Sequence, residues 1–142
     1  MLGRKDYTQD ELDAAARAVA APVSAYNKLA KAADAAADSQ VARALEAMEP
    51  LLFNNLALAL DRRFVHRLRM VVGKQTNPLN ELELISESLM NNDGVLRGNN
   101  VIKYDPEQSV AKLNLGDRIR LTVAQFDTLS NAVLTDVERR FR

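Results

Sequence analysis

The sequence predicts a mainly α protein: an antiparallel helical bundle with proline-broken helices and a small β-hairpin or three-stranded sheet before the C-terminal helix. Three observations indicate this α+β class. Apolar residues recur every three or four positions over 39–72, as in an amphipathic helix. Capping boxes mark helix starts at Thr8 and Thr122. After Gly94, turn residues and short apolar–polar alternations replace the helical spacing, which favours β structure.

The alanine-rich residues 1–38 are expected to form a helix that begins at Thr8, where Glu11 completes the capping box. Alanine favours the helix but buries little area. This segment is therefore expected either to supply the first bundle helices, packed closely through small side chains, or to project as an arm that needs a partner. Pro22 is expected to kink or split the helix near Ala21, because it removes a backbone hydrogen bond and clashes with the preceding turn.

Residues 39–94 are expected to form the helical core. Its first helix should run to Gly73, a residue type that commonly ends helices. Pro50 is expected to bend or break it after Glu49. The expected inner positions of this helix are Val41, Leu45, Met48, Leu52, Leu56, Leu60, Phe64, Leu68 and Val71.

The second core helix is expected to begin at Asn77, with Pro78 at its first position, and to end at Gly94. Within the first core helix, Asn54 and Asn55 interrupt an apolar run. At least one of these amides should lie near a packed surface, where it needs a hydrogen-bond partner. The expected inner positions of the second helix are Leu79, Leu82, Ile85, Leu89 and Met90.

Residues 95–142 are expected to hold the β element and the final helix. A three-residue loop at Gly116 would place apolar residues of both flanking segments on one face of a hairpin, and residues 101–104 could add a third strand. The hairpin pairs would be Leu115 with Ile119 and Leu113 with Leu121. The inner face of the final helix should hold Val123, Phe126, Leu129, Val133, Leu134, Val137 and Phe141.

Length and composition fit one domain over residues 1–142, since 47% of the residues are apolar and 27% are charged. No apolar run approaches the roughly 20 residues that a membrane helix needs, so no membrane association is expected. The first residues show no signal-peptide pattern, and we expect a cytoplasmic location. The chain has no cysteine, which excludes disulfides and thiolate chemistry. Its formal net charge is zero, so any polyanion binding would need a local basic patch.

Residues 62–74, RRFVHRLRMVVGK, form the most basic segment and hold the single histidine. On a helix the cationic side chains share one broad face, which could bind phosphate, a carboxylate or nucleic acid. The structural interpretation is favoured over this one, because cations are stabilised at a helix C-terminus and the following acidic segment, with Glu81, Glu83 and Glu87, is expected to neutralise the basic face. The candidate anion-binding residues are Arg62, Arg63, His66, Arg67 and Arg69.

Known catalytic motifs are missing from the sequence. Gly73 and Lys74 resemble the end of a phosphate-binding loop, but the earlier glycine is replaced by Leu68 and no serine or threonine follows the lysine. Neither a GxSxG elbow nor an HExxH motif occurs. Tyr104 and Asp105 could do acid–base work, but nothing in the sequence positions a substrate for them. The sequence therefore predicts no catalytic residue, cofactor or metal ligand.

These observations leave three hypotheses for function. The first is a non-enzymatic protein–protein interaction or scaffold module that self-associates, expected as a homodimer, because a long amphipathic helix stands beside an alanine-rich segment with little core of its own. The second is polyanion binding, to nucleic acid or phosphate, through the basic face of residues 62–69; an acidic protein would be another partner for that face. The third is an enzyme of unrecognised type.

Overall fold

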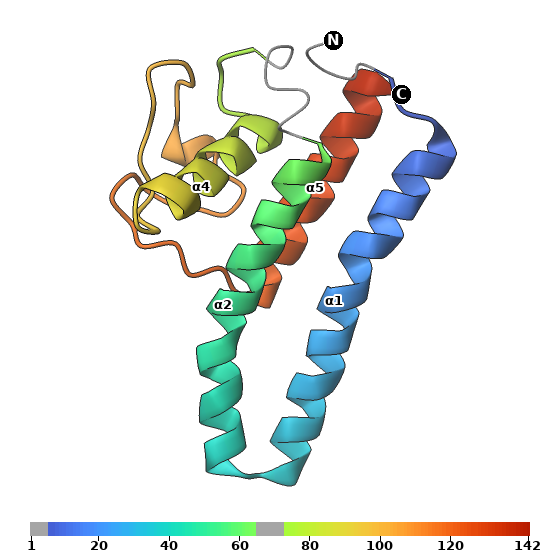
Figure 1. Cartoon of the computed structure of the whole chain (residues 1–142), viewed down its shortest axis with the longest axis vertical. Helices are drawn as coiled ribbons and strands as arrows, with labels where there is room; N and C mark the ends of the chain where they lie inside the picture. The colour runs from blue at the N-terminus through green and yellow to red at the C-terminus, as the bar shows by residue number, and fades with distance from the viewer. Residues whose placement is uncertain (1–5, 65–72) are drawn as a thin grey trace.

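A computed structural model of the chain describes residues 6–64 and 73–142, and these ranges contain four α-helices packed together. Three of them lie side by side: α1 (Gln9–Ala36), α2 (Ser39–Arg63) and α5 (Val123–Phe141). The shorter α4 (Pro78–Asn91) crosses α2 at the end of the molecule that holds both termini (Figure 1). The prediction of a mainly helical bundle is confirmed.

Local signals in the sequence account for the helix starts. Both capping boxes form, with Thr8 reciprocally bonded to Glu11 and Thr122 reciprocally bonded to Gln125. The Asn77 side chain accepts a hydrogen bond from the backbone N–H of Asn80 at 2.8 Å, and Pro78 opens α4 as expected.

The two prolines inside helices do not break them. Pro22 lies within the 28 residues of α1, and Pro50 within the 25 residues of α2. The prediction of proline-broken helices is therefore wrong. A proline removes one backbone hydrogen bond, and here packing holds the helix together: Val19, Val23 and Tyr26 are buried on both sides of Pro22, and Phe53 is buried just after Pro50.

The core lies where α1, α2, α4 and α5 meet. Phe53 of α2 is fully buried at its centre, with the ring of Tyr26 edge-on at 5.1 Å and the ring of Phe126 at 5.4 Å between centroids. The inner face predicted for α5 is confirmed, since five of its members are buried and the other two are partly buried against the core: Val123, Phe126, Leu129, Val133, Leu134, Val137 and Phe141.

The predicted β-hairpin or three-stranded sheet is not present in the described residues. Their β structure is one isolated antiparallel bridge between Val95 and Arg118. Gly116 does sit in a tight turn, in which the Asp117 N–H donates to the Asn114 carbonyl at 3.1 Å. However, the segment opposite 116–119 is 94–96 and not 113–115, because Leu96 exchanges backbone hydrogen bonds with residues 116 and 117.

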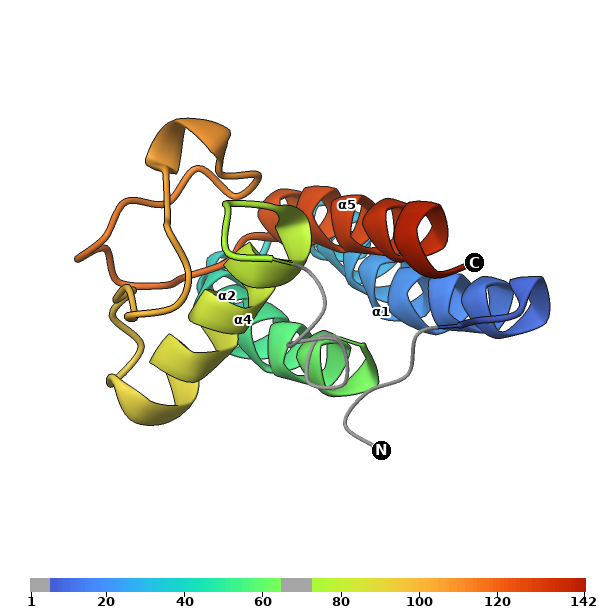
Figure 2. The ribbon, with the colours of Figure 1, turned by 90° about the horizontal axis from the view of Figure 1, so that it is seen from above.

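In place of a neighbouring strand, side chains of the helices form hydrogen bonds with backbone groups within residues 92–121. Asn54 of α2 donates to the Ile119 carbonyl at 2.9 Å and accepts from the Leu121 N–H at 3.1 Å. The expectation that one of the paired asparagines meets a packed surface is thus confirmed for Asn54. This irregular segment lies beside α2 and α5, on the side away from α1 (Figure 2).

Helix α2 ends at Arg63, with Phe64 as its C-cap. The sequence predicted a helix that continues to Gly73, but residues 65–72 lie outside the described residues, and with them the predicted inner positions Leu68 and Val71. None of the described helices is long and apolar enough to cross a bilayer.

Candidate functional site

The α1–α2 hairpin extends beyond the rest of the bundle. Helix α5 begins at the level of Glu49, whose carboxylate accepts a hydrogen bond from the Val123 N–H at 2.9 Å. Beyond that level, the end of α1 and the start of α2 pack on each other, and none of the other described helices lies beside them (Figure 1). A two-helix hairpin can bury one seam between its helices, so its remaining apolar residues stay on the surface.

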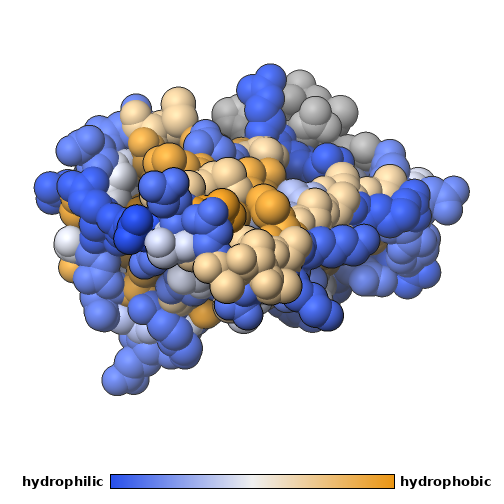
Figure 3. Space-filling view, turned by 90° about the horizontal axis from the view of Figure 1, so that it is seen from below, coloured by the Kyte–Doolittle hydropathy of each residue, from blue (hydrophilic) through white to orange (hydrophobic). Residues whose placement is uncertain are grey.

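Apolar side chains gather on one side of this projecting hairpin. We call this surface the tip face and define it by Leu29, Ala33, Val41, Leu45, Met48 and Leu51. All but Leu51 line a shallow groove of about 260 Å³, together with Ala44. Viewed toward the end of the hairpin, apolar residues form a continuous patch at its centre (Figure 3).

The tip face exposes large apolar side chains to solvent. The exposed fractions are 49% for Leu29, 43% for Val41, 37% for Met48 and 66% for Leu51. Val41 and Met48 were expected to lie on the inner side of α2, and that prediction is wrong. The inner side is formed instead by Leu45, Leu52, Leu56, Leu60 and Phe64, which are buried or partly buried against the core.

Charged residues are absent from the helix positions that make up this side of the hairpin. On α1, alternating steps of four and three residues from Ala18 to Ala36 pass only through alanines, Pro22 and Leu29; on α2, alternating steps of three and four residues from Val41 reach no charge before Arg62. Scattered exposed apolar residues are ordinary, whereas a contiguous uncharged patch marks an interaction site. The α1 positions are Ala18, Pro22, Ala25, Leu29, Ala32 and Ala36.

The basic segment is described only in part. Arg62 and Arg63 end α2 and are exposed to solvent. The other three candidate anion-binding residues, His66, Arg67 and Arg69, lie outside the described residues. The structure therefore brings together two of the five predicted residues and leaves the rest of the predicted face as an expectation.

The acidic helix is not held against Arg62 and Arg63. Glu81 of α4 is 1% exposed and its carboxylate accepts three hydrogen bonds from residues 109–111. Glu87 accepts one from the amide of Asn99 at 3.3 Å. Neither of these two carboxylates forms an ion pair with Arg62 or Arg63. Glu83 is engaged in an interaction as well, and most of the basic face lies outside the described residues, so its pairing with the acidic helix stays a prediction. Helix α4 turns Glu81 inward, toward backbone donors that the spacing of the sequence did not reveal.

Glu81 is the polar residue with the most extensive buried contacts in the described chain. The Ser109 hydroxyl donates to its carboxylate at 2.7 Å, and the backbone N–H groups of Val110 and Ala111 donate at 2.7 and 3.0 Å. A buried carboxylate is tolerated when donors of this kind satisfy it. This arrangement anchors the irregular segment to α4 and has a structural role.

A second acidic site lies between α2 and α4. Asp61, Glu83 and Glu87 line a pocket of about 410 Å³ together with Leu58 and the buried Ser86. The Ser86 hydroxyl has no hydrogen-bond partner among the described residues, but Asp61 and Glu83 are both engaged in interactions. No group of three or more acidic or histidine side chains in the described ranges is arranged to hold a metal ion.

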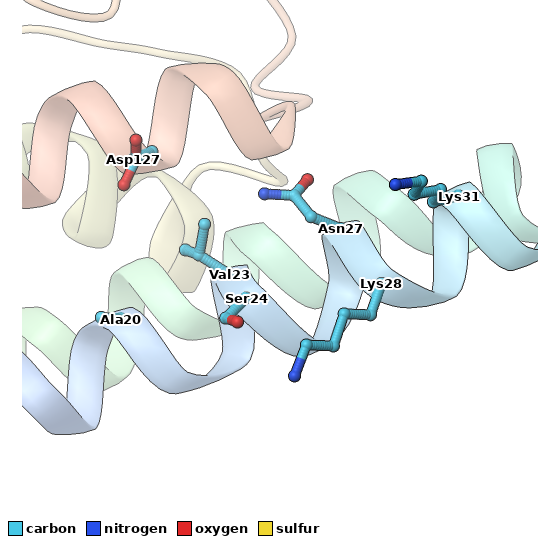
Figure 4. Close-up of a pocket in the computed structure, with 7 residues that line it drawn as sticks. All are labelled: Ala20, Val23, Ser24, Asn27, Lys28, Lys31 and Asp127. Atoms are coloured by element: carbon cyan, nitrogen blue, oxygen red, sulfur yellow. The ribbon is translucent and has the colours of Figure 1, made fainter.

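A third hollow lies where α5 begins beside α1. It is open, about 430 Å³ in volume, and lined by Ala20, Val23, Ser24, Asn27, Lys28, Lys31 and Asp127. Val23 and Asn27 point from α1 toward α5, whereas Lys28 points away from the hollow (Figure 4). The two lysines do not converge on one point, so the hollow lacks the geometry of an anion site.

Tyr104 and Asp105 have structural roles. The Tyr104 hydroxyl donates to the Leu113 carbonyl, and burial is the main cause that raises its pKa above the ordinary value of 10.0. The Asp105 side chain caps a short 3₁₀ helix, Pro106–Gln108, by accepting from the Glu107 N–H. A phenol with a raised pKa is a poor general base near neutral pH.

Comparison with known proteins gives no family for this chain: no family model matches its sequence, and neither the curated proteins nor the solved structures contain a significant match. The surface of the described residues is therefore the remaining guide to function, and the packing of the described helices leaves the tip face uncovered.

Proposed function

We propose that this protein is a non-enzymatic interaction or scaffold module that self-associates through the tip face. The observation that carries the proposal is the exposure of Leu29, Val41, Met48 and Leu51 on one uncharged side of the hairpin, where no other helix of the described ranges covers it. A second copy is the chosen partner because it brings an identical uncharged two-helix surface, and two such hairpins can complete a four-helix arrangement.

The energy available from this surface is sufficient for a reversible dimer. Burying the exposed half of a large apolar side chain contributes about 1 kcal/mol. Four such side chains in each copy therefore contribute roughly 8 kcal/mol, supplemented by contacts of the surrounding alanines. Association costs at least about 4 kcal/mol in lost freedom of motion. The difference of roughly 4 kcal/mol corresponds to a Kd of about 1 mM, and the alanine contacts shift it toward tighter binding.

Analytical ultracentrifugation at micromolar to near-millimolar concentration tests the proposal. The unmodified protein should show a concentration-dependent dimer, and Val41→Glu/Leu51→Glu should sediment as a folded monomer, since a dimer would bury four uncompensated carboxylates. The matched control is Val101→Glu, which places the same charge at a side chain that is 60% exposed in the irregular segment. An unmodified protein that stays monomeric throughout contradicts the proposal.

The second candidate function is polyanion binding through the basic residues 62–69. The observation in its favour is that Arg62 and Arg63 are exposed while Glu81 and Glu87 are engaged elsewhere. Binding of heparin or DNA should then weaken steeply with added salt. Alanine at Arg62, Arg63, Arg67 and Arg69 should abolish it, whereas alanine at Arg17 and Arg43 should not. Absence of binding by the unmodified protein at low salt excludes this function.

A further inference from the structure

Helix α2 carries an exposed apolar seam in addition to its inner face. The seam residues follow one another at intervals of three, four, three, four and three residues, and all but the last, which is half-buried, are exposed. Alternating intervals of three and four residues are the pattern of helices that pack knobs into holes. The seam consists of Val41, Ala44, Met48, Leu51, Asn55 and Leu58.

We propose that two copies of the chain pack their α2 seams antiparallel, about a twofold axis that crosses α2 between Glu49 and Pro50. This inference rests on the proposed self-association and specifies its geometry. The partner is a second copy of this chain, and the interface is the tip face extended along α2 to Leu58.

The intervals of the seam determine this register. They read the same in both directions, so an antiparallel copy centred between residues 49 and 50 places every seam residue opposite another seam residue. A shift by one or two residues would bring seam positions against the flanks of the partner helix. The pairs across the axis are Val41 with Leu58, Ala44 with Asn55, and Met48 with Leu51.

Residue size and hydrogen bonding fit these pairs. Asn55, the polar member, lies opposite Ala44 of the second copy, so a longer side chain meets a short one. The Asn55 amide already donates to the Leu51 carbonyl of its own helix at 2.7 Å. It can therefore enter an apolar interface without leaving that amide unpaired.

Helix α1 supports the same axis. Tyr26 packs on Phe53, so Leu29, three residues further along α1, is level with Pro50, three residues back along α2. The exposed leucine of α1 thus lies at the level of the proposed axis. The α1 residues that flank Leu29 on this side are alanines, and small side chains let two helices approach closely. The product is a four-helix arrangement of two hairpins.

Antiparallel packing also separates the bulky ends of the two molecules. Helix α4 flanks α2 near Leu58, where both helices line the acidic pocket. In a parallel pair the two copies of α4 would lie at the same end of the interface. In the antiparallel pair each α4 adjoins the slender hairpin end of the other copy.

The overlap is large enough for a weak, specific dimer. From Val41 to Leu58 the paired helices extend for about 27 Å, and two helices side by side span roughly 20 Å. The flat footprint is about 550 Å², and the accessible surface over a corrugated helix face is larger. It therefore approaches the ~800 Å² per partner of a standard interface.

Cysteine cross-linking tests the register directly, because the natural chain contains no cysteine. Ala44→Cys and Asn55→Cys are made as separate full-length proteins, mixed and oxidised. The mixture should give a disulfide-linked dimer on a non-reducing gel. Each variant alone should stay unlinked, since identical positions would lie about 16 Å apart along the interface, too far for a disulfide.

A mixture of Ala44→Cys with Glu46→Cys is the matched control and should also stay unlinked, because Glu46 lies off the seam. Cross-linking of each single variant with itself would indicate a parallel pair and overturn the proposed register. A protein that sediments as a dimer but gives no linked product in the Ala44→Cys and Asn55→Cys mixture overturns the register and leaves self-association standing. A protein that sediments as a monomer removes both.

Discussion

The two halves of the α1–α2 hairpin are made of the same two helices but differ in their surroundings. In the half near the termini, α4 and α5 cover the hairpin, and Phe53, Ala57 and Leu60 of α2 are almost completely buried. In the projecting half, Val41 and Met48 of the same helix are exposed. Apolar spacing runs through both halves, so the difference comes from which other elements reach each half.

This contrast shows that one helix can carry two apolar faces, of which one is buried in the core and the other is exposed. The inner face of α2 completes the core of the chain itself, whereas the seam from Val41 to Leu58 has no cover from the described residues over most of its length. Changes in the packed half should therefore cost stability, and changes in the projecting half should alter association with little effect on folding.

Phe53→Ala should produce the largest loss. The ring is fully buried against Tyr26 and Phe126, and removing a buried phenylalanine costs about 3–5 kcal/mol. Urea unfolding measures the change. Leu51→Ala, on the exposed side of the same helix, is the matched control, and at a concentration where the protein is monomeric it should change the free energy of unfolding by less than about 0.5 kcal/mol. Equal losses for both variants would refute the division between the two halves.

Glu81→Gln should cost about 2–3 kcal/mol, because the new amide NH₂ group replaces one of the two oxygens that accept from the Val110 and Ala111 N–H groups and leaves that backbone donor unpaired. Hydrogen exchange of at least one of these two amides should speed up more than exchange in α1. Glu87→Gln is the control, since Glu87 is exposed and accepts from Asn99 alone among the described residues. Unchanged exchange at Val110 and Ala111 would show that Glu81 does not anchor the segment.

The neighbouring asparagines of α2 should respond differently to the same substitution. Asn54→Ala removes both hydrogen bonds that tie α2 to the segment before α5, and a loss of about 1–2 kcal/mol is expected. Asn55→Ala should leave the stability of the monomer almost unchanged, because Asn55 is exposed and bonds only within its own helix. Thermal or urea unfolding of both variants at low concentration checks this pair, and an equal loss at both positions would contradict it.

The smallest effect should be a decrease in the free energy of unfolding at alkaline pH, caused by ionisation of Tyr26. Burial, with the nearby Glu49 as a second cause, raises the pKa of Tyr26 above its ordinary value of 10.0. The unfolded chain therefore releases this proton at a lower pH than the folded chain, and the free energy of unfolding falls as the pH rises above 10.0. Tyr26→Phe should lose less stability than the unmodified protein between about pH 9 and about pH 11. Parallel curves would exclude Tyr26 as the cause.

Sequence reasoning located the helices because their signals are local. The capping boxes at Thr8 and Thr122 and the cap at Asn77 involve residues three positions apart. It failed for residues 92–121, where alternating apolar residues suggested a hairpin. The partners of that segment are side chains of α2 and α4 that lie far away in sequence, and no spacing within the segment indicates them.

For the candidate surface, the sequence supplied the apolar periodicity of α2 and the expectation that an alanine-rich segment needs a partner. It could not assign Val41 and Met48 to the exposed side. Apolar residues on both faces of α2 are separated by three or four positions, so this spacing alone does not tell one face from the other. The strict alternation of three- and four-residue intervals from Val41 to Leu58 was the available signal.

By itself, therefore, the sequence determined that the chain is mainly helical and where its helices begin, since caps and helical periodicity depend on neighbours within a turn or two. The tertiary structure decided that Pro22 and Pro50 stay within continuous helices, that Glu81 turns inward, and that the tip face remains uncovered. Each of these depends on which distant segments come into contact, and burial and hydrogen bonding across such distances are properties of the assembled fold.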